Sequence, residues 1–309
     1  MASPLAAIVG PTGSGKTALA MAVAKRLPVE IIVADLRQLL RGMAVGTAQP
    51  DATARAAVRH HLVDVAAPGD SFTVADWVLE ARQRVPQIAA RGRLPLLVGG
   101  SGLLVSALVD GYTFDAPPSA EVRAELAREL AASGVGALAA RLRRADPAAA
   151  ARTDLRNPRR VTRALERSAA AGGGAAHPPG TAPWPGPVIL LGVRRPRDVL
   201  SRRIDDRARW LFANGLLDET RRLLDAGLQP GQPPMTSHGY AEAAHLLAGE
   251  WSLEEAIAVT ARRTRQYAKR QQTWFGRDER IVWLDAGDRP GDDPALVAEA
   301  LGALEAVRG

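Results

Sequence analysis

Cysteine is absent from the sequence of 309 residues, and no long apolar segment occurs in it. The absence of cysteine excludes disulfide bonds and thiol chemistry and is common in cytoplasmic proteins. The apolar stretch 94–109 has no charged residue but contains three glycines, so it predicts a strand, a turn and a helix rather than a membrane span. The N-terminal residues lack the positive charge that opens a signal peptide. We therefore expect a cytoplasmic, globular protein that does not associate with membranes, and we expect a monomer.

Lysine is also scarce, because only three of the 40 basic residues are lysines: Lys16, Lys25 and Lys269. Where such a chain keeps a lysine, a compact ammonium group is favoured over a planar guanidinium. The net charge of +7 permits a polyanionic partner without requiring one. Aromatic residues make up only 4% of the chain, so we expect arginine planes to stack on bases if the partner is RNA.

Short apolar segments alternate with stretches of helical spacing over most of the chain. The apolar segments predict strands at residues 5–9, 30–34, 93–100, 188–193 and 280–286. The stretches between and after them predict helices at residues 17–27, 71–91, 196–227, 253–275 and 293–307. Because the strands are nearly continuous apolar runs, they predict a parallel sheet that is covered by helices.

The pattern changes after Phe114, where alanine, leucine and arginine replace the strand signals. Between residues 117 and 167 eleven arginines stand against six acidic residues. Pro117 with Ser119 predicts the start of a helix, and the segment 169–187, rich in Gly, Ala and Pro, is typical of a linker. We therefore predict a core made of residues 1–114 and 188–309, including C-terminal helices, and a helical insertion with its linker at residues 115–187.

The segment Gly10–Thr17, GPTGSGKT, matches the phosphate-binding pattern G-x-x-x-x-G-K-[ST]. It follows a predicted strand and opens a predicted helix, so a plain glycine-rich turn is the weaker interpretation. Its backbone N–H groups and Lys16 can reach phosphate oxygens, and Thr17 can hold Mg²⁺. The predicted diphosphate-binding residues here are Gly10, Thr12, Gly13, Ser14, Gly15, Lys16 and Thr17. We therefore expect an α/β fold with a P-loop NTPase-like parallel sheet core and a helical insertion domain.

A second acidic strand end, which an ATP hydrolase of this class needs for Mg²⁺, is not evident in the third strand, because that strand ends in Gly99 and Gly100. The segments HHLVD and IVWLD end in Asp64 and Asp285, but the sequence leaves their place in the core open. Hydrolysis is therefore less favoured than kinase-like transfer or a reaction in which the phosphates are the leaving group. An ATP-dependent small-molecule kinase remains an alternative.

Asp35 directly follows the apolar strand at residues 30–34, in the stretch EIIVADLRQLLRG. A carboxylate in this position can be a metal ligand, a catalytic base or the cap of a following helix. Residues 36–40 do not form a capping box, which weakens the third interpretation. The sequence pattern by itself leaves the other two open.

Five further motifs follow the phosphate-binding segment along the chain. They are ADLRQLLRGMAVGTAQP at 34–50, HHLVD at 60–64, LPLLVGGSGLL at 94–104, RRVTRALE at 159–166 and TRQYAKRQQTWF at 264–275. Together they resemble the tRNA dimethylallyltransferase (tRNA isopentenyltransferase) family over residues 5–286. The resemblance implies a prenyltransferase that moves a dimethylallyl group from dimethylallyl diphosphate to the exocyclic amine of the adenine 3′ of the anticodon in tRNA. It also implies the anticodon stem-loop as partner and Mg²⁺ as cofactor.

The resemblance implies a role for particular residues as well. Asp35 matches the acid that takes the proton of the attacking amine, and the segment Gly10–Thr17 would hold the diphosphate leaving group rather than ATP. Lys16, Thr17 and Ser101 complete the implied catalytic set, and Arg265 is assigned to the diphosphate. The positions assigned to tRNA are Asp35, Leu36, Arg37, Gln38, Ser101, Arg123, Arg159, Arg160, Arg163, Arg262, Gln266, Lys269 and Arg270.

Several positions depart from the family pattern. Hydroxyl or cationic side chains of the family are replaced here by Leu36, Leu40, Gln49, Leu104, Ala241 and Gly276. The acid, the phosphate-binding segment and the RQYAKRQ helix remain, so an active enzyme is expected with altered tRNA affinity or loop preference. A non-catalytic RNA-binding relative remains a further alternative.

Three features also have structural interpretations. The basic face of the C-terminal helix and the arginine-rich insertion can be solvated surfaces, whose ion pairs contribute little. His60 and His61 are adjacent on a strand and point to opposite faces, so packing or hydrogen bonding is favoured over a shared metal. Trp274 and Phe275 are favoured as core residues at a helix end over a base-stacking pair.

Overall fold

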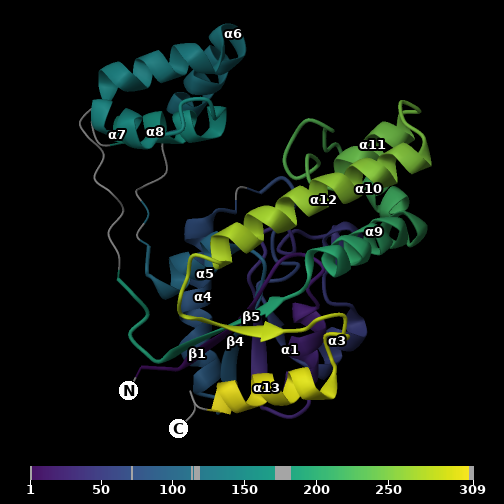
Figure 1. Cartoon of the computed structure of the whole chain (residues 1–309). Coiled ribbons are helices and arrows are strands. Elements are labelled where there is room, and N and C mark those ends of the chain that lie inside the picture. The colour runs from purple at the N-terminus through teal and green to yellow at the C-terminus, as the bar shows by residue number, and fades with distance from the viewer. Residues whose placement is uncertain (1, 71, 113, 115–118, 171–181, 306–309) are drawn as a thin grey trace. The chain divides into compact units, whose positions relative to one another are not determined.

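The computed structural model describes residues 2–70, 72–112, 114, 119–170 and 182–305. The chain forms two compact units, Met1–Asp110 with Pro183–Gly309, and Gly111–Ala182 (Figure 1). The predicted boundaries lie after residues 114 and 187. Pro117 and residues 171–181 of the predicted linker lie outside the described residues.

A six-stranded sheet forms the centre of the larger unit, and all its neighbouring strands pair in parallel. The order is β3-β2-β4-β1-β5-β6, with β1 at Leu5–Val9, β2 at Val29–Val33, β3 at His60–His61, β4 at Leu94–Gly99, β5 at Val188–Arg194 and β6 at Ile281–Asp285. Every residue of β1 is fully buried, so both faces of the sheet are covered there. The predicted fold class, an α/β fold with a P-loop NTPase-like parallel core and a helical insertion, is confirmed.

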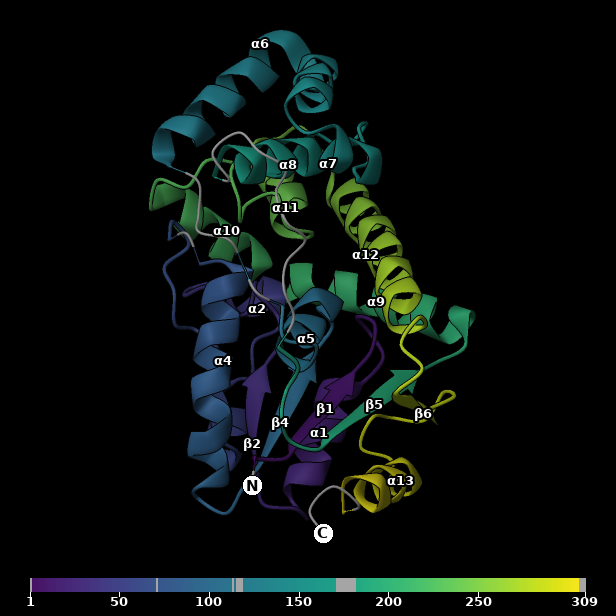
Figure 2. The same cartoon turned by 90° about the vertical axis from the view of Figure 1, so that its left-hand side faces the viewer.

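Three helices pack directly on the sheet: α1 (Lys16–Ala24), α4 (Val74–Ala89) and α13 (Pro294–Glu305). α5 (Gly102–Val109) packs on α4. α1 and α13 share one apolar cluster with Ile8 and Leu96 on one face. α4 lies beside β2 on the other face (Figure 2). There the Trp77 indole N–H donates to the Val33 carbonyl oxygen at 3.0 Å. Among the described residues, no helix is long and apolar enough to cross a membrane.

Further helices lie after the carboxyl ends of the strands: α2 (Ala44–Thr47), α3 (Ala52–Ala57), α9 (Arg197–Ala213), α10 (Leu216–Asp225), α11 (Tyr240–Leu247) and α12 (Leu253–Phe275). Met43, Phe212 and Tyr240 belong to the apolar core that α9, α10 and α11 share with the α2 segment. The prediction of one helix over residues 196–227 is wrong, because the chain turns between α9 and α10 at Gly215, whose φ is +99°. Such a φ suits glycine and ends the helix.

The smaller unit is helical in its described residues, which form α6 (Ala120–Ala145), α7 (Pro147–Arg152) and α8 (Pro158–Ala170). The Ser119 hydroxyl caps α6 by accepting the Val122 N–H at 3.3 Å. α6 bends at Gly134, which has a φ of +71°. Leu126 and Leu165 meet other leucines in a core that belongs to this unit alone.

Glu30 on β2 is a buried carboxylate that ties the sheet to neighbouring segments. It is 3% exposed and accepts two hydrogen bonds from the Arg91 guanidinium, at 2.8 and 2.7 Å. The His61 ring bonds to it at 2.7 Å. The Arg91 hydrogen bonds are the largest cause that lowers the pKa of Glu30 from 4.5 to about 2, with His61 acting in the same direction. A charged Glu30 therefore stabilises the fold above its ordinary pKa.

Replacing Glu30 with Gln is expected to lower the free energy of unfolding at pH 7 by about 2 kcal/mol, because Arg91 loses its buried partner. The folded-state pKa is depressed, so this stability is lost in the natural protein as the pH falls from 4.5 towards 2. Urea unfolding at pH 7 and at pH 3 measures both effects, and the variant is expected to lose less stability between them. The control is Glu80→Gln, which removes only a half-exposed pair with Arg84. Equal stability of Glu30→Gln and the natural protein at pH 7 would contradict the assignment.

Candidate active site

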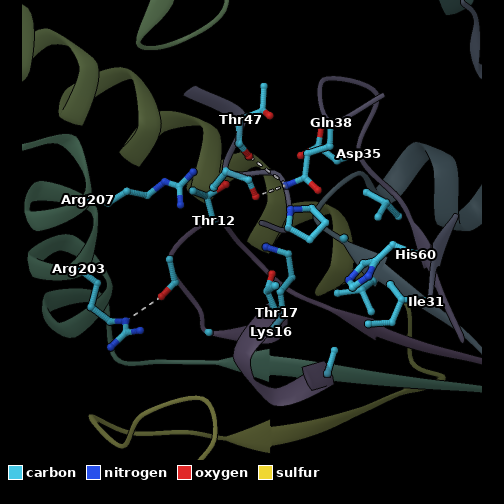
Figure 3. Close-up of a pocket in the computed structure, with 18 of the residues that line it drawn as sticks. Thr12, Lys16, Thr17, Ile31, Asp35, Gln38, Thr47, His60, Arg203 and Arg207 are labelled. Atoms are coloured by element: carbon cyan, nitrogen blue, oxygen red, sulfur yellow. Dashed lines mark hydrogen bonds between the residues drawn. The ribbon is translucent and has the colours of Figure 1, made fainter. Parts of the chain in front are cut away.

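A cavity of about 510 Å³ opens at the carboxyl ends of β1, β2 and β4 (Figure 3). Ligand sites of open α/β sheets lie at this edge. The phosphate-binding segment lines one side through Thr12, Lys16 and Thr17, and Asp35 lines another. The phosphate-binding segment and Asp35, which the sequence predicts separately, therefore line the same cavity.

The turn between β1 and α1 has the shape of a phosphate cradle. Gly13 and Gly15 have φ values of +86° and +92°, which other residues rarely adopt. α1 begins at Lys16, so the N-terminus of the helix opens towards the cavity. Gly10 and Ser14 are also predicted diphosphate contacts but do not line the cavity. Ser14 is fully buried, its N–H donates to the Pro11 carbonyl oxygen, and Gly10 packs against it, so both shape the turn from beneath.

Three distant side chains hold the cradle in place. Arg203 Nε donates to the Gly13 carbonyl oxygen at 2.9 Å (Figure 3), and Arg195 Nε donates to the Ser14 carbonyl oxygen at 2.6 Å. The Gln271 amide oxygen accepts the Thr12 N–H at 2.9 Å, and its nitrogen donates to the Gly100 carbonyl oxygen. The sequence analysis missed these three residues, although Gln271 lies inside the RQYAKRQQ motif.

Asp35 follows the end of β2 and lines the same cavity as Lys16 and Arg207 (Figure 3), and its charge acts on both. Its Oδ1 accepts the Arg37 N–H at 2.9 Å. No donor in the described part of the chain bonds to Oδ2. The residues after Asp35 form turns rather than a helix, so the cap interpretation is wrong. One carboxylate oxygen is thus anchored while the other can accept a proton.

The electrostatics of the cavity favour an anion. Lys16, Arg203 and Arg207 place three cations on its walls against the two carboxylates of Asp35 and Asp206. Desolvation lowers the pKa of Lys16 to about 8, with the Arg207 charge in the same direction and the Asp35 charge opposed. Arg203 and Arg207 stand one turn apart on α9, a helical spacing that the sequence analysis did not use.

A second wall of the cavity is apolar. Ala20, Ile31 and Val33 come from α1 and β2, and Val98 comes from β4. Trp210 of α9 also lines the cavity and is about half exposed. A small branched hydrocarbon fits this wall, whereas a charged group would lose hydration there.

The segment between Asp35 and α3 is held by two glutamines. Gln38 Nε2 donates to the Thr47 and Ala48 carbonyl oxygens at 3.0 and 3.1 Å (Figure 3). Gln49 Nε2 donates to the carbonyl oxygens of Gln38 and Leu40, and its Oε1 accepts from Arg55. The loss of a cation at Gln49 is therefore accompanied by a structural role, with Arg55 supplying the positive charge beside it.

The other departures lie in different surroundings. Leu104 is fully buried in α5, and Leu40 packs against the core around Met43. Leu36 and Ala241 are half-buried. Gly276 caps the carboxyl end of α12 and is exposed. Leu104 is thus a core residue rather than a missing surface contact.

α12 turns one face to the site and presents the residues assigned to tRNA on another. Tyr267 and Gln271 point to the active-site side, whereas Arg262, Gln266 and Lys269 are exposed elsewhere. Two further residues of the predicted sets, Arg37 and Arg270, place their guanidinium groups 5.4 and 5.7 Å from the Tyr267 ring centre.

Arg265 does not line the cavity, although the sequence analysis assigns it to the diphosphate. Its guanidinium pairs with Asp205 on α9, and both border a separate pocket. Ser101 precedes α5, and its N–H donates to the Ala34 carbonyl oxygen at 3.3 Å. Ser101 is also outside the cavity lining, two residues after Gly99, which lines the cavity.

The predicted RNA contacts of the insertion gather on α8. Arg159, Arg160 and Arg163 line an open groove of about 710 Å³ together with Arg152 and Arg167. Arg163 pairs with Glu166 at 3.0 Å. Arg123 lies on α6 and is exposed.

The histidine pair and the two other strand-end acids have partners of their own. His60 lines the cavity and bonds to the Val58 carbonyl oxygen at 2.7 Å, while His61 bonds to Glu30. Asp64 pairs with Arg55, and Asp285 pairs with Arg194 at the end of β6. Neither acid lines the cavity. Within the described residues no group of three or more His, Asp or Glu side chains could hold a metal ion.

Comparison with known proteins agrees with this geometry. The family described as IPP transferase matches residues 38–278. A tRNA dimethylallyltransferase of Clavibacter sepedonicus is 43% identical over 99% of this chain and 99% of its own length. One of Thermomicrobium roseum is 41% identical over 93% and 88%. The solved structure of a tRNA isopentenylpyrophosphate transferase from Bacillus halodurans is 38% identical, with a TM-score of 0.73 over 98% of this chain and 96% of that one. The chain therefore belongs to the IPP transferase family.

Proposed function

We propose that this chain transfers a dimethylallyl group from dimethylallyl diphosphate to the exocyclic amine of the adenine 3′ of the anticodon in tRNA. The observation that carries the proposal is the single cavity that holds a phosphate cradle, an apolar wall and Asp35. The relatives that carry the tRNA dimethylallyltransferase name cover nearly the whole chain.

The cradle suits the leaving group. An allylic diphosphate ionises once the negative charge on its oxygens is neutralised. Lys16 and the N-terminus of α1 lie together in the cavity and can both neutralise that charge. Arg207 adds a further cation on the opposite helix, and Arg203 fixes the cradle. Most of the catalysis is then electrostatic and positional, with the apolar wall holding the hydrocarbon for attack.

Asp35 suits the base. The adenine amine is a poor nucleophile, because its lone pair is delocalised into the ring. A carboxylate that accepts its proton as the new C–N bond forms contributes typically about 10²–10⁴-fold. The anchored Oδ1 holds the group still, and Oδ2 receives the proton.

The residues present also fit Mg²⁺. Thr17 places its hydroxyl at the start of α1 inside the cavity, and Mg²⁺ in such sites takes most ligands from phosphates and water. When bound, the ion supplies positive charge to the departing diphosphate. Thr17 is the hydroxyl at the start of α1, so the remaining ligands would come from the diphosphate and water.

The tRNA requires contacts outside the cavity, because the target base must leave its stack to reach Asp35. The arginine-lined groove on α8 can bind RNA phosphates, and such contacts do not depend on the nucleotide sequence. Arg37 and Arg270 over Tyr267 offer planar surfaces near the site. We propose that the chain works as a cytoplasmic monomer, since one chain carries the cradle, the base and these basic surfaces.

The proposal predicts a prenylated adenosine in tRNA incubated with the protein, Mg²⁺ and dimethylallyl diphosphate. Mass spectrometry of the digested nucleosides detects it, and release of diphosphate is expected to require the anticodon stem-loop. Turnover of ATP without RNA would instead favour a small-molecule kinase. RNA binding with no product would favour a non-catalytic relative. Prenylation of free adenine nucleotides at the rate of tRNA would contradict the RNA part of the proposal.

A further inference from the structure

His238 is a half-buried residue whose two ring nitrogens are buried without a hydrogen-bond partner. Among the described residues, few buried side-chain atoms lack a partner, and three of these are His238 Nδ1, His238 Nε2 and Thr260 Oγ1. All three belong to residues that line a second, smaller cavity of about 60 Å³. A buried polar atom without a partner costs about 1–3 kcal/mol, so this grouping needs an explanation.

The smaller cavity lies directly beside the active site. Asp35, Thr47 and Arg207 line both cavities, as does Thr12. Asp35 thus stands on the wall between the space for the substrates and the space that His238 faces. The remaining polar walls of the smaller cavity come from α12 and the turn before α11, and include Ser237, Thr264 and Tyr267.

Water is the occupant that fits these walls. A volume of about 60 Å³ has room for roughly two water molecules at about 30 Å³ each. Each water needs two to four polar partners, and His238, Thr260 and the Asp35 carboxylate can supply them. Such waters would join Asp35 to His238 by hydrogen bonds.

The surroundings of His238 keep it neutral. Arg37 faces it from the turn after β2, and Arg263 and Arg270 face it from α12. The Tyr267 ring lies edge-on at 5.8 Å, Arg207 and Asp35 stand across the cavity, and Glu242 is occupied by Arg263. Burial, followed by the charges of Arg37, Arg263 and Arg270, lowers the pKa of His238 to about 4.

We propose that His238 and the waters of the smaller cavity carry the amine proton away from Asp35 after each transfer. The inference rests on the proposed function. The Asp35 carboxyl gives its proton to a cavity water, and the bare ring nitrogen of His238 accepts a proton from that row of waters. The other ring nitrogen gives its proton to a further water, which exchanges it with the buffer. Asp35 returns to the carboxylate, His238 returns to the neutral imidazole with its tautomer exchanged, and one proton reaches the buffer.

The test separates product formation from proton release in single-turnover reactions with anticodon stem-loop RNA, dimethylallyl diphosphate and Mg²⁺. Quenched samples measure prenylated adenosine, and a pH-indicator dye measures the proton. In His238→Gln, product is expected within about twofold of the natural rate, because Asp35 still accepts the first proton, whereas the proton appears at least about tenfold later. Added imidazole is expected to shorten that delay. The matched control is His245→Gln, an exposed histidine of α11 that stacks on Trp251, which is expected to show no delay.

The outcomes divide clearly. A proton that appears together with product in His238→Gln overturns the relay. A fall of both rates together without rescue by imidazole also overturns it and assigns His238 a structural role. The absence of product from the natural protein would instead refute the proposed function itself.

Discussion

Replacing Asp35 with Asn is expected to lower the single-turnover rate of prenyl transfer by at least about 100-fold while RNA binding stays nearly unchanged. The Asn side-chain oxygen can still accept the Arg37 N–H, so the turn after β2 keeps its shape. The amide nitrogen that replaces Oδ2 cannot take a proton from the attacking amine. The rate is measured by rapid quench with anticodon stem-loop RNA, and the affinity by RNA titration at fixed salt concentration.

Asp285→Asn is the matched control for this experiment. Asp285 also ends a parallel strand of the same sheet, but it is exposed, pairs with Arg194 and lies outside the cavity. Its rate is expected to stay within about twofold of the natural protein, as is usual for surface substitutions. An Asp35→Asn protein with the natural single-turnover rate would remove Asp35 from the role of base.

The sequence predicted those parts of the site that are encoded by neighbouring residues. The cradle is one such part, since the two positive-φ glycines and the helix start at Lys16 follow each other within one turn. The position of Asp35 at a strand end is another, because parallel strands bring their carboxyl ends to one edge. Five ordered motifs then identified the family that the comparisons confirm.

The sequence did not predict the parts of the site that depend on packing between distant elements. Arg203 reaches Gly13 across 190 positions, and Gln271 reaches Thr12 across 259. Which face of α12 turns inward is decided by its packing on α9 and α11, and the basic stripe on the helix does not reveal it. Arg265 belongs to that stripe and is occupied by Asp205.

The departures from the family pattern show the same limit. Leu104 was considered as a lost hydroxyl near the RNA, yet it is fully buried in the core. Gln49 was considered as a lost cation, yet it bonds to two backbone carbonyls and to Arg55. A substitution's meaning depends on whether its side chain faces solvent or the interior, and the sequence alone does not give that for an irregular loop.

Glu219 fixes the position of α2 in the cavity wall, and its replacement is the second change with a large expected effect. This carboxylate of α10 is 2% exposed and accepts the N–H groups of Val45 and Gly46, each at 2.9 Å. The Tyr240 hydroxyl also donates to it, at 2.6 Å. Burial and the Glu219 charge raise the pKa of Tyr240, so the phenol stays protonated as a donor. The three bonds fix α2, whose last residue, Thr47, lines both cavities.

Replacing Glu219 with Ala is expected to lower the free energy of unfolding by about 4 kcal/mol, because two buried N–H groups and a phenol lose one shared acceptor. Tyr240→Phe removes only one of the donors and is expected to cost about 1 kcal/mol. Urea unfolding measures both, and Asp218→Asn is the control, since Asp218 is the exposed neighbour on the same helix and pairs with Arg221.

The same series separates stability from function. Gly46 has no room for a side chain, because an added Cβ would lie 2.4 Å from the Tyr240 ring. α2 therefore packs closely on Tyr240 while the hydrogen bonds to Glu219 hold it. Without the hydrogen bonds to Glu219, Thr47 and Ala48 can move, and their carbonyl oxygens bind Gln38. The Michaelis constant for the RNA is therefore expected to rise about tenfold in folded Glu219→Ala protein. A variant that keeps both natural stability and natural RNA dependence would show that α2 is positioned by its apolar contacts alone.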